Sequence, residues 1–266
     1  GIGSAAGSSG QLALVPMGQY VIDGYGWAIA AIVFACLVAA IIPLSMAMKD
    51  PKREAVDPNA GRQQNLREAV GEAMGHRGFI LLTVGYFVCG YQVMFLGTHL
   101  PNFISEAGQN PWVGATALSL IGLFNIIGTL TWGALGGKFR MKYLLTSIYL
   151  LRSAVLAVYI MLPITAMSTY IFAAAIGLLW LATVPLTSGL VARMFGLRYM
   201  ATLTGIVFFS HQLGSFAGAW LGGVFFETTG SYDTIWWVGI ALGLVAAALH
   251  YPIDDKPVAR VQAEGA

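Results

Sequence analysis

Charged side chains are scarce in this sequence. Asp, Glu, Lys and Arg make up 10% of its 266 residues, whereas they make up about 25% of a typical soluble domain. Its two cysteines, Cys36 and Cys89, lie in apolar stretches that predict neither a disulfide nor a metal site. The sequence also lacks a Gly-Lys-Ser/Thr phosphate-binding loop and any His/Cys cluster with metal-ligand spacing. We therefore expect no cofactor, no metal and no enzymatic chemistry, and the net charge of +2 predicts no nucleic-acid partner.

Apolar stretches make up most of the chain. Hydrophobic residues account for 57% of the sequence, and a helix needs about 20 mostly apolar residues to cross a bilayer. Segments of about this length lie at residues 2–22, 27–48, 79–101, 113–135, 143–163, 169–192, 201–225 and 234–253. The sequence therefore predicts an all-α, polytopic transmembrane bundle with eight spans in a lipid bilayer.

The basic residues alternate with these segments in a regular way. Thirteen of the 14 Lys and Arg residues fall in four regions, at 49–78, 138–142, 193–198 and 256–260. The loops between these regions contain no basic residue and only four acids, which are Asp23, Glu106, Glu227 and Asp233. Because basic loops stay in the cytoplasm during insertion, the pattern predicts a multi-pass protein of the inner (plasma) membrane with both ends of this chain cytoplasmic.

The polar stretch 49–78 divides the chain into unequal parts. Residues 1–48 hold two spans, residues 79–253 hold six, and residues 254–266 form a tail. Within the polar stretch, 49–61 predicts an irregular linker, and the helical spacing of apolar residues over 65–77 predicts a short amphipathic helix. The first span is rich in glycine and serine, so we expect it to pack among other helices. We expect those partner helices to precede it and to be missing from this chain.

The loop after the fourth segment resembles a cytoplasmic signature of the major facilitator superfamily. Gly133, Lys138 and Lys142 match that signature, whereas Gly137 stands where an acid is expected and Arg140 where a second glycine is expected. The resemblance covers nearly the whole chain as spans five to twelve of a twelve-helix transporter. It implies that residues 1–48 are the last two spans of an N-terminal bundle and that residues 79–253 are the C-terminal bundle.

Three further stretches are similar to the monocarboxylate-porter and oxalate/formate-antiporter branch of that superfamily. They are residues 90–101, 122–128 and 210–216. This resemblance implies a secondary active transporter that moves a small organic solute, a carboxylate anion, by alternating access, with proton coupling as an option. The drug/proton antiporter signature pairs Gly directly with Pro, but here Val15 precedes Pro16. Carriers of nitrate, sugars or drugs, and a receptor or scaffold that transports nothing, remain the alternatives.

Arg152 is the exception among the basic residues. It lies ten residues after Lys142 and eleven before Pro163, which places it roughly 15 Å from either end of its helix. An arginine there costs at least about 2.5–3.5 kcal/mol, and no Asp or Glu lies in any span to offset the charge. Its partner is therefore an acid outside this chain, backbone carbonyls, water or an anionic substrate. Arg152 either binds a carboxylate with its planar fork or has a structural or gating role.

Polar residues in other spans are further candidates for solute binding. His211 and Gln212 lie near the middle of 201–225, where His211 either accepts a proton during transport or is a neutral residue hydrogen-bonded inside the bundle. Beside them, the glycines at 214, 218 and 222 predict a helix-packing ridge. Gln92 and His99 share a face of 79–101 next to Tyr91, and His99 is either a cavity residue or an interfacial one.

Asn125 and Pro185 complete the candidates. Asn125 lies in mid-span of 113–135 and either hydrogen-bonds a solute or joins two helices. Pro185 lies among Thr183, Thr187 and Ser188. It predicts a bend that frees a backbone carbonyl, which serves either as a gating hinge or only for packing.

Overall fold

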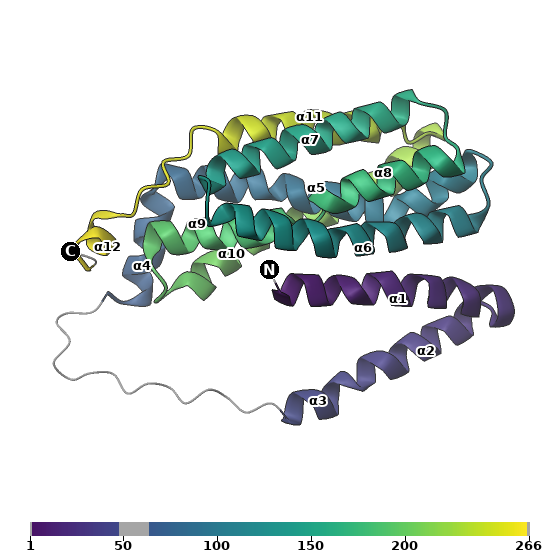
Figure 1. Cartoon of the computed structure of the whole chain (residues 1–266), viewed down its shortest axis with the longest axis horizontal. Coiled ribbons are helices and arrows are strands. Elements are labelled where there is room, and N and C mark those ends of the chain that lie inside the picture. The colour runs from purple at the N-terminus through teal and green to yellow at the C-terminus, as the bar shows by residue number, and fades with distance from the viewer. Residues whose placement is uncertain (1, 48–63, 265–266) are drawn as a thin grey trace.

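The structure, a computed structural model, describes residues 2–47 and 64–264, and every regular element in those ranges is an α-helix (Figure 1). The expected all-α fold is confirmed. In chain order the helices are α1 (Ile2–Tyr25), α2 (Trp27–Ala39), α3 (Ile41–Ala47), α4 (Leu66–Gly75), α5 (Arg77–Glu106), α6 (Pro111–Gly136), α7 (Met141–Met161), α8 (Ala166–Leu179), α9 (Thr183–Phe195), α10 (Met200–Thr229), α11 (Asp233–His250) and α12 (Ala259–Glu264).

Among the described residues, helices lie in all eight stretches that the sequence predicts as spans, and α2 and α3 together form the second. Six of them are both long and apolar enough to cross a membrane: Trp27–Met46, Arg77–Glu106, Pro111–Gly136, Met141–Met161, Ala166–Phe195 and Asp233–His250. The other two, α1 and α10, have 24 and 30 residues but are richer in small and polar residues. The stretch expected as one span at 169–192 is formed by two helices, α8 and α9, because the helix breaks at residues 180–182.

The short helix expected over 65–77 is present as α4. Asn65 caps it, since its side chain accepts from the Glu68 amide while the Glu68 carboxylate accepts from the Asn65 amide. Its buried side comes from Ala69 and Ala73, whereas Leu66 is half exposed. The linker expected at 49–61 lies outside the described residues.

A ridge of small residues brings α5 and α10 into direct backbone contact. Gly214, Gly218 and Gly222 are all buried on α10. A Cβ atom at Gly214 would overlap the backbone oxygen of Phe87, and one at Gly218 would overlap that of Tyr91. The predicted packing ridge is thus confirmed, and only glycine fits at its centre.

The seven helices α5–α11 enclose two apolar clusters, one toward each end of the bundle. The first contains Phe79, Leu82 and Leu145, and the second contains Phe95, Leu100 and Trp236. The α5 residues 89–92 lie where the two clusters meet, and they include the buried polar residue Gln92.

The chain has a basic end. Figure 1 shows that α4, α12, the α6–α7 turn and the α9–α10 turn all lie at one end of the bundle. The described basic residues other than Arg152 lie in these regions or in the chain next to them. We call this end of the bundle the basic end. Lys49, Lys52, Arg53 and Arg62 lie outside the described residues.

The first two spans differ in how much they are buried. Figure 1 shows α1 alongside α6, and a Cβ atom at Gly122 of α6 would lie 2.9 Å from the Leu12 amide nitrogen of α1. In α2 only Ala30 is buried, and large apolar side chains such as Trp27 and Ile32 are exposed. The apolar surface of α2 therefore faces lipid or further protein.

Candidate functional site

The break between α8 and α9 follows from Pro185. A proline has no N–H to donate to the carbonyl four residues earlier, and its ring collides with that carbonyl. Helix α8 ends at Leu179 and α9 begins at Thr183. The Val184 amide donates to Leu181 at 3.0 Å rather than to Trp180, so carbonyls at the end of α8 need other partners. The structure thus shows an interruption of the helix just before Pro185, and a role of Pro185 as a gating hinge stays a prediction.

Arg152 supplies those partners. Its side chain is 1% exposed, and its Nε and Nη2 donate to the Leu179 oxygen at 3.1 and 2.7 Å, while Nη2 also donates to the Trp180 oxygen. Of the partners considered for this arginine, the structure shows backbone carbonyls. Broken helical backbone is stable inside a membrane protein only when other groups satisfy it, and Arg152 does this from α7.

Three other side chains complete the surroundings of Arg152. Nη1 lies 3.5 Å from both the Cys89 sulfur and the Gln92 Oε1. Cys89 also lies 3.2 Å from the Thr183 hydroxyl, and Gln92 donates to the Gly239 oxygen at 2.9 Å. We call Arg152, Cys89, Gln92 and Thr183, with the carbonyls of residues 179 and 180, the arginine cluster.

The arginine cluster contains no carboxylate. Its acceptors are carbonyl, amide, hydroxyl and thiol groups. Among the described residues the ion pairs lie at the basic end, between Arg140 and Asp255 and between Arg260 and Glu72. The donors of Arg152 are therefore satisfied while its positive charge is not neutralised by a carboxylate.

Asn125 of α6 contacts the same helix break. It is fully buried, and its Oδ1 accepts from the Leu181 amide at 2.9 Å and from the Thr129 hydroxyl at 3.0 Å. Its Nδ2 donates to the Ser8 hydroxyl of α1 at 2.6 Å. Asn125 thus joins α6 to both α1 and the break.

His211 lies beside the arginine cluster on α10. Its ring is half-buried, 5.0 Å from that of Tyr86 and 5.9 Å from that of Phe208. Its Nδ1 is 3.4 Å from both the Gln212 Oε1 and the Ser215 hydroxyl. Gln212 itself is exposed.

Tyr91 and His99 form their hydrogen bonds outside the arginine cluster. The Tyr91 hydroxyl donates to the Ile235 oxygen at 3.4 Å. His99 Nε2 lies 2.8 Å from the Ala219 oxygen, and its Nδ1 lies 3.3 Å from the Tyr232 hydroxyl. The residues predicted to bind solute therefore lie in separate groups. Gln92 lies next to Arg152, whereas His99 contacts Ala219 and Tyr232 instead.

The residues of the signature loop have distinct surroundings. Lys142 is buried and donates from Nζ to the Ile253 oxygen at 2.7 Å, so it holds the start of the tail. Lys138 is exposed. A Cβ atom at Gly133 would lie 3.7 Å from the Pro185 ring, which places this part of α6 directly against the first turn of α9.

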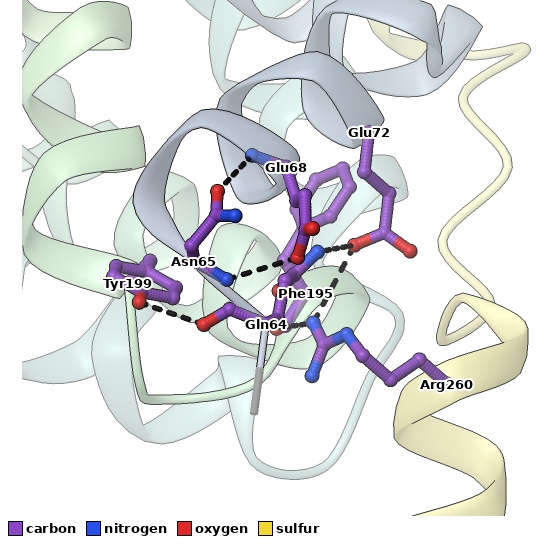
Figure 2. Close-up of polar contacts among 7 residues, drawn as sticks. All are labelled: Gln64, Asn65, Glu68, Glu72, Phe195, Tyr199 and Arg260. Carbon is purple, nitrogen blue, oxygen red and sulfur yellow. Dashed lines mark hydrogen bonds and ion pairs between the residues drawn. The ribbon is translucent and has the colours of Figure 1, made fainter. Parts of the chain in front are cut away.

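Polar contacts at the basic end join α4, α9, α12 and the residue before α10. Arg260 of α12 donates to the Phe195 oxygen at 2.9 Å and lies 3.5 Å from Glu72 of α4 (Figure 2). The side-chain amide of Gln64 donates to the Glu72 carboxylate at 3.0 Å. The hydroxyl of Tyr199, just before α10, donates to the backbone oxygen of Gln64 at 2.8 Å. These contacts fix α4 and the tail against the α9–α10 turn.

Asp255 makes the attachment of the tail sensitive to pH. Hydrogen bonds from Arg140 hold the pKa of this buried carboxyl below its usual range. A carboxyl whose pKa is lowered by folding stabilises the folded state above its unfolded pKa, about 3.9, and the effect disappears as pH falls through the folded pKa. We expect the tail to become more accessible to protease below about pH 4. Asp255→Asn should be accessible already at pH 7, whereas Asp254→Asn, which keeps the Arg140 contact, should behave as the parent.

Cavities of different polarity lie on two sides of the bundle. The larger, about 570 Å³, lies on α7 and α8 and is lined by apolar side chains that include Val158, Ile171 and Phe172. The smaller, about 370 Å³, lies between α1, α5 and α6. Its polar lining residues are Gln19, Thr98, Asn102 and Ser105. The lining of the larger cavity also includes Tyr159, Thr165 and Ser168.

Sequence reasoning missed two members of the arginine cluster and most of its geometry. The sequence predicts no role for Cys89 and indicates Thr183 only as a neighbour of Pro185. A signal was present for Cys89, since it lies three residues before Gln92 and so shares its helical face. No signal in the sequence pairs Arg152 with carbonyls 27 and 28 residues further along the chain.

Comparison with known proteins gives two matches. A family model described as Major Facilitator Superfamily matches residues 1–219. The chain is also 27% identical over 273 residues to a Bacillus subtilis (strain 168) protein described as the uncharacterized MFS-type transporter YcxA. That alignment covers 96% of this chain and 64% of the relative.

Proposed function

The chain belongs to the Major Facilitator Superfamily of membrane transporters, and on that premise we propose that it is part of a secondary active transporter for a small carboxylate anion. In such proteins, two helical bundles rock against each other and expose a central site to each side of the membrane in turn. In this proposal α1–α3 belong to one bundle and α5–α11 form the other.

The observation that supports an anionic solute is the charge of Arg152. A buried charge is costly unless an opposite charge lies near it, and the groups that bond Arg152 include no carboxylate. In a low-dielectric interior the resulting positive potential extends well beyond hydrogen-bond distance. An anion entering the bundle lowers this energy, whereas a neutral solute does not. Arg152 thus favours an anion without needing to release the carbonyls that it holds.

Uptake into vesicles tests this function. We would reconstitute the full-length parent protein and measure uptake of radiolabelled acetate, lactate and pyruvate, with lactamide as a neutral analogue of lactate. We expect carboxylate uptake above that of empty vesicles and little uptake of lactamide. Uptake of nitrate, a sugar or a cationic drug in place of the carboxylates would redirect the substrate assignment. No uptake of any solute would favour a receptor or scaffold.

Proton coupling is the second part of the proposal, and it concerns His211. The titratable or charged groups that face His211 are Tyr86 and Cys89 on α5 and Arg152 on α7. We expect that an inward-directed proton gradient accelerates carboxylate uptake by the parent but not by His211→Gln. Exchange of labelled for unlabelled carboxylate should persist in that variant, because exchange requires no net proton movement. His76→Gln, at the basic end, should retain the gradient response; equal gradient responses in the parent and His211→Gln would exclude His211 as the proton carrier.

We further propose that the basic end faces the cytoplasm and that additional helices of the full-length protein cover α2. The first proposal rests on the retention of basic loops in the cytoplasm. The second is supported by the exposed apolar side chains of α2 and by the greater length of the Bacillus subtilis relative. Labelling of a cysteine introduced at exposed Lys138 with a membrane-impermeant maleimide tests the first. Labelling in intact cells would place this end outside.

A further inference from the structure

Hydrogen bonds link α1 to α5 through the backbone of the α8–α9 break. They run from Ser8 to Asn125 at 2.6 Å and from Asn125 to the Leu181 amide at 2.9 Å. On the other side of the same break, Arg152 holds the Leu179 oxygen at 2.7 Å and lies 3.5 Å from Gln92 of α5. The α8–α9 break is therefore held from opposite sides by Asn125 and Arg152.

We infer that Asn125 is a positioning residue for transport, which transmits movement of α1 against α6 to the α8–α9 break. This inference rests on the proposed function, because alternating access is what moves the bundle containing α1 relative to the other bundle. The alternative role of Asn125, binding a solute directly, is not favoured by the geometry. Its amide already makes three hydrogen bonds within the protein, to Ser8, Thr129 and Leu181.

The packing around Asn125 makes this transmission direct. A Cβ atom at Gly122, one turn before Asn125, would lie 3.1 Å from the backbone oxygen of Ser8 and 2.9 Å from the amide nitrogen of Leu12. On the other face of α6, a Cβ atom at Gly128 would overlap the backbone of Leu178 at the end of α8. Helix α6 therefore touches α1 on one side and the end of α8 on the other, with little room for independent movement.

The break is the part of the bundle that such a movement would alter. Residues 180–182 have left the α-helical hydrogen-bond pattern, so a small displacement there changes backbone angles without breaking a regular helix. The Leu181 amide has an amide side chain rather than a backbone carbonyl as its acceptor. If Asn125 shifts with Ser8, the Leu181 amide loses its acceptor while Arg152 still holds the carbonyls of residues 179 and 180.

Hydrogen–deuterium exchange of the full-length parent tests this without a ligand. Gly122→Ala should push α1 away from α6, and Ser8→Ala removes the hydroxyl that Asn125 contacts. We expect both to accelerate exchange in peptides covering residues 177–185 by about fivefold, the factor that corresponds to one ordinary hydrogen bond. Gly205→Ala, on a helix face where a Cβ atom would meet nothing within 4 Å, and Ser119→Ala, whose buried hydroxyl bonds its own helix, should change nothing there.

The outcomes separate this inference from the proposed function. Unchanged exchange over 177–185 in both Gly122→Ala and Ser8→Ala would overturn the role of Asn125, whatever the protein transports. Accelerated exchange together with absence of carboxylate uptake by the parent would keep the mechanical link and reject the substrate assignment. Where uptake is present, Ser8→Ala should lower the maximal rate and leave the KM for the carboxylate unchanged. A changed KM with an unchanged maximal rate would instead make Asn125 part of the solute site.

Discussion

Gly214→Ala is expected to prevent stable folding of the bundle. The added Cβ atom would overlap the backbone oxygen of Phe87, and neither helix can yield without separating α5 from α10. Overpacking costs typically about 1–3 kcal/mol when side chains can move aside, and here the obstacle is backbone, so we expect at least about 3 kcal/mol. Loss of the monodisperse peak in size-exclusion chromatography, or a large fall in Tm, measures the effect.

The matched control is the same substitution at Gly205 on the same helix. A Cβ atom there meets nothing within 4 Å, and alanine in a helix interior is favoured over glycine by roughly 0.5–1 kcal/mol. Gly205→Ala should therefore raise Tm slightly while Gly214→Ala lowers it strongly. Equal effects of the two substitutions would show that α5 and α10 are not in backbone contact.

Arg152→Met is expected to destabilise the protein through the helix break. Methionine has about the right length to fill the space but has no donors, so the carbonyls of Leu179 and Trp180 lose theirs. Each buried acceptor left unsatisfied costs about 1–3 kcal/mol, partly offset because the cost of burying the charge disappears. We expect a net loss of roughly 1–4 kcal/mol and faster amide exchange over residues 177–185.

Arg152→Lys should fall between the parent and Arg152→Met in stability. Lysine keeps the charge and donates through a single ammonium group, but it lacks the fork that reaches two neighbouring carbonyls. Arg198→Met, which removes an arginine from the basic end, controls for loss of charge alone. If Arg152→Met were as stable as the parent, another group would have to satisfy the two carbonyls.

The sequence predicted the helices well because their signals are local. Runs of apolar residues identify spans, the glycines at 214, 218 and 222 lie on one helical face, and Pro185 breaks its own helix wherever it is placed. The capped helix over residues 66–75 has its whole signal within ten residues. Each of these predictions depends on neighbours in the chain, which the sequence lists directly.

The site was harder to predict because its contacts join distant residues. Asn125 bonds Ser8 from 117 positions away and the Leu181 amide from 56 positions away, and no local pattern encodes such pairs. For Arg152 the sequence left four classes of partner open, and only packing shows that the end of α8 lies opposite it. The grouping of Gln92 with Arg152, and of His99 with Tyr232, likewise depends on how α5 faces α7 and α11.

The most direct test of the central claim is the ratio of lactate to lactamide uptake in vesicles that hold the full-length parent, Arg152→Lys or Arg152→Met. Uptake would be normalised to folded protein, because the variants differ in stability. If the buried charge selects the anion, the parent and Arg152→Lys prefer lactate and Arg152→Met loses that preference. The same preference in all three proteins would show that the charge of Arg152 does not select the solute.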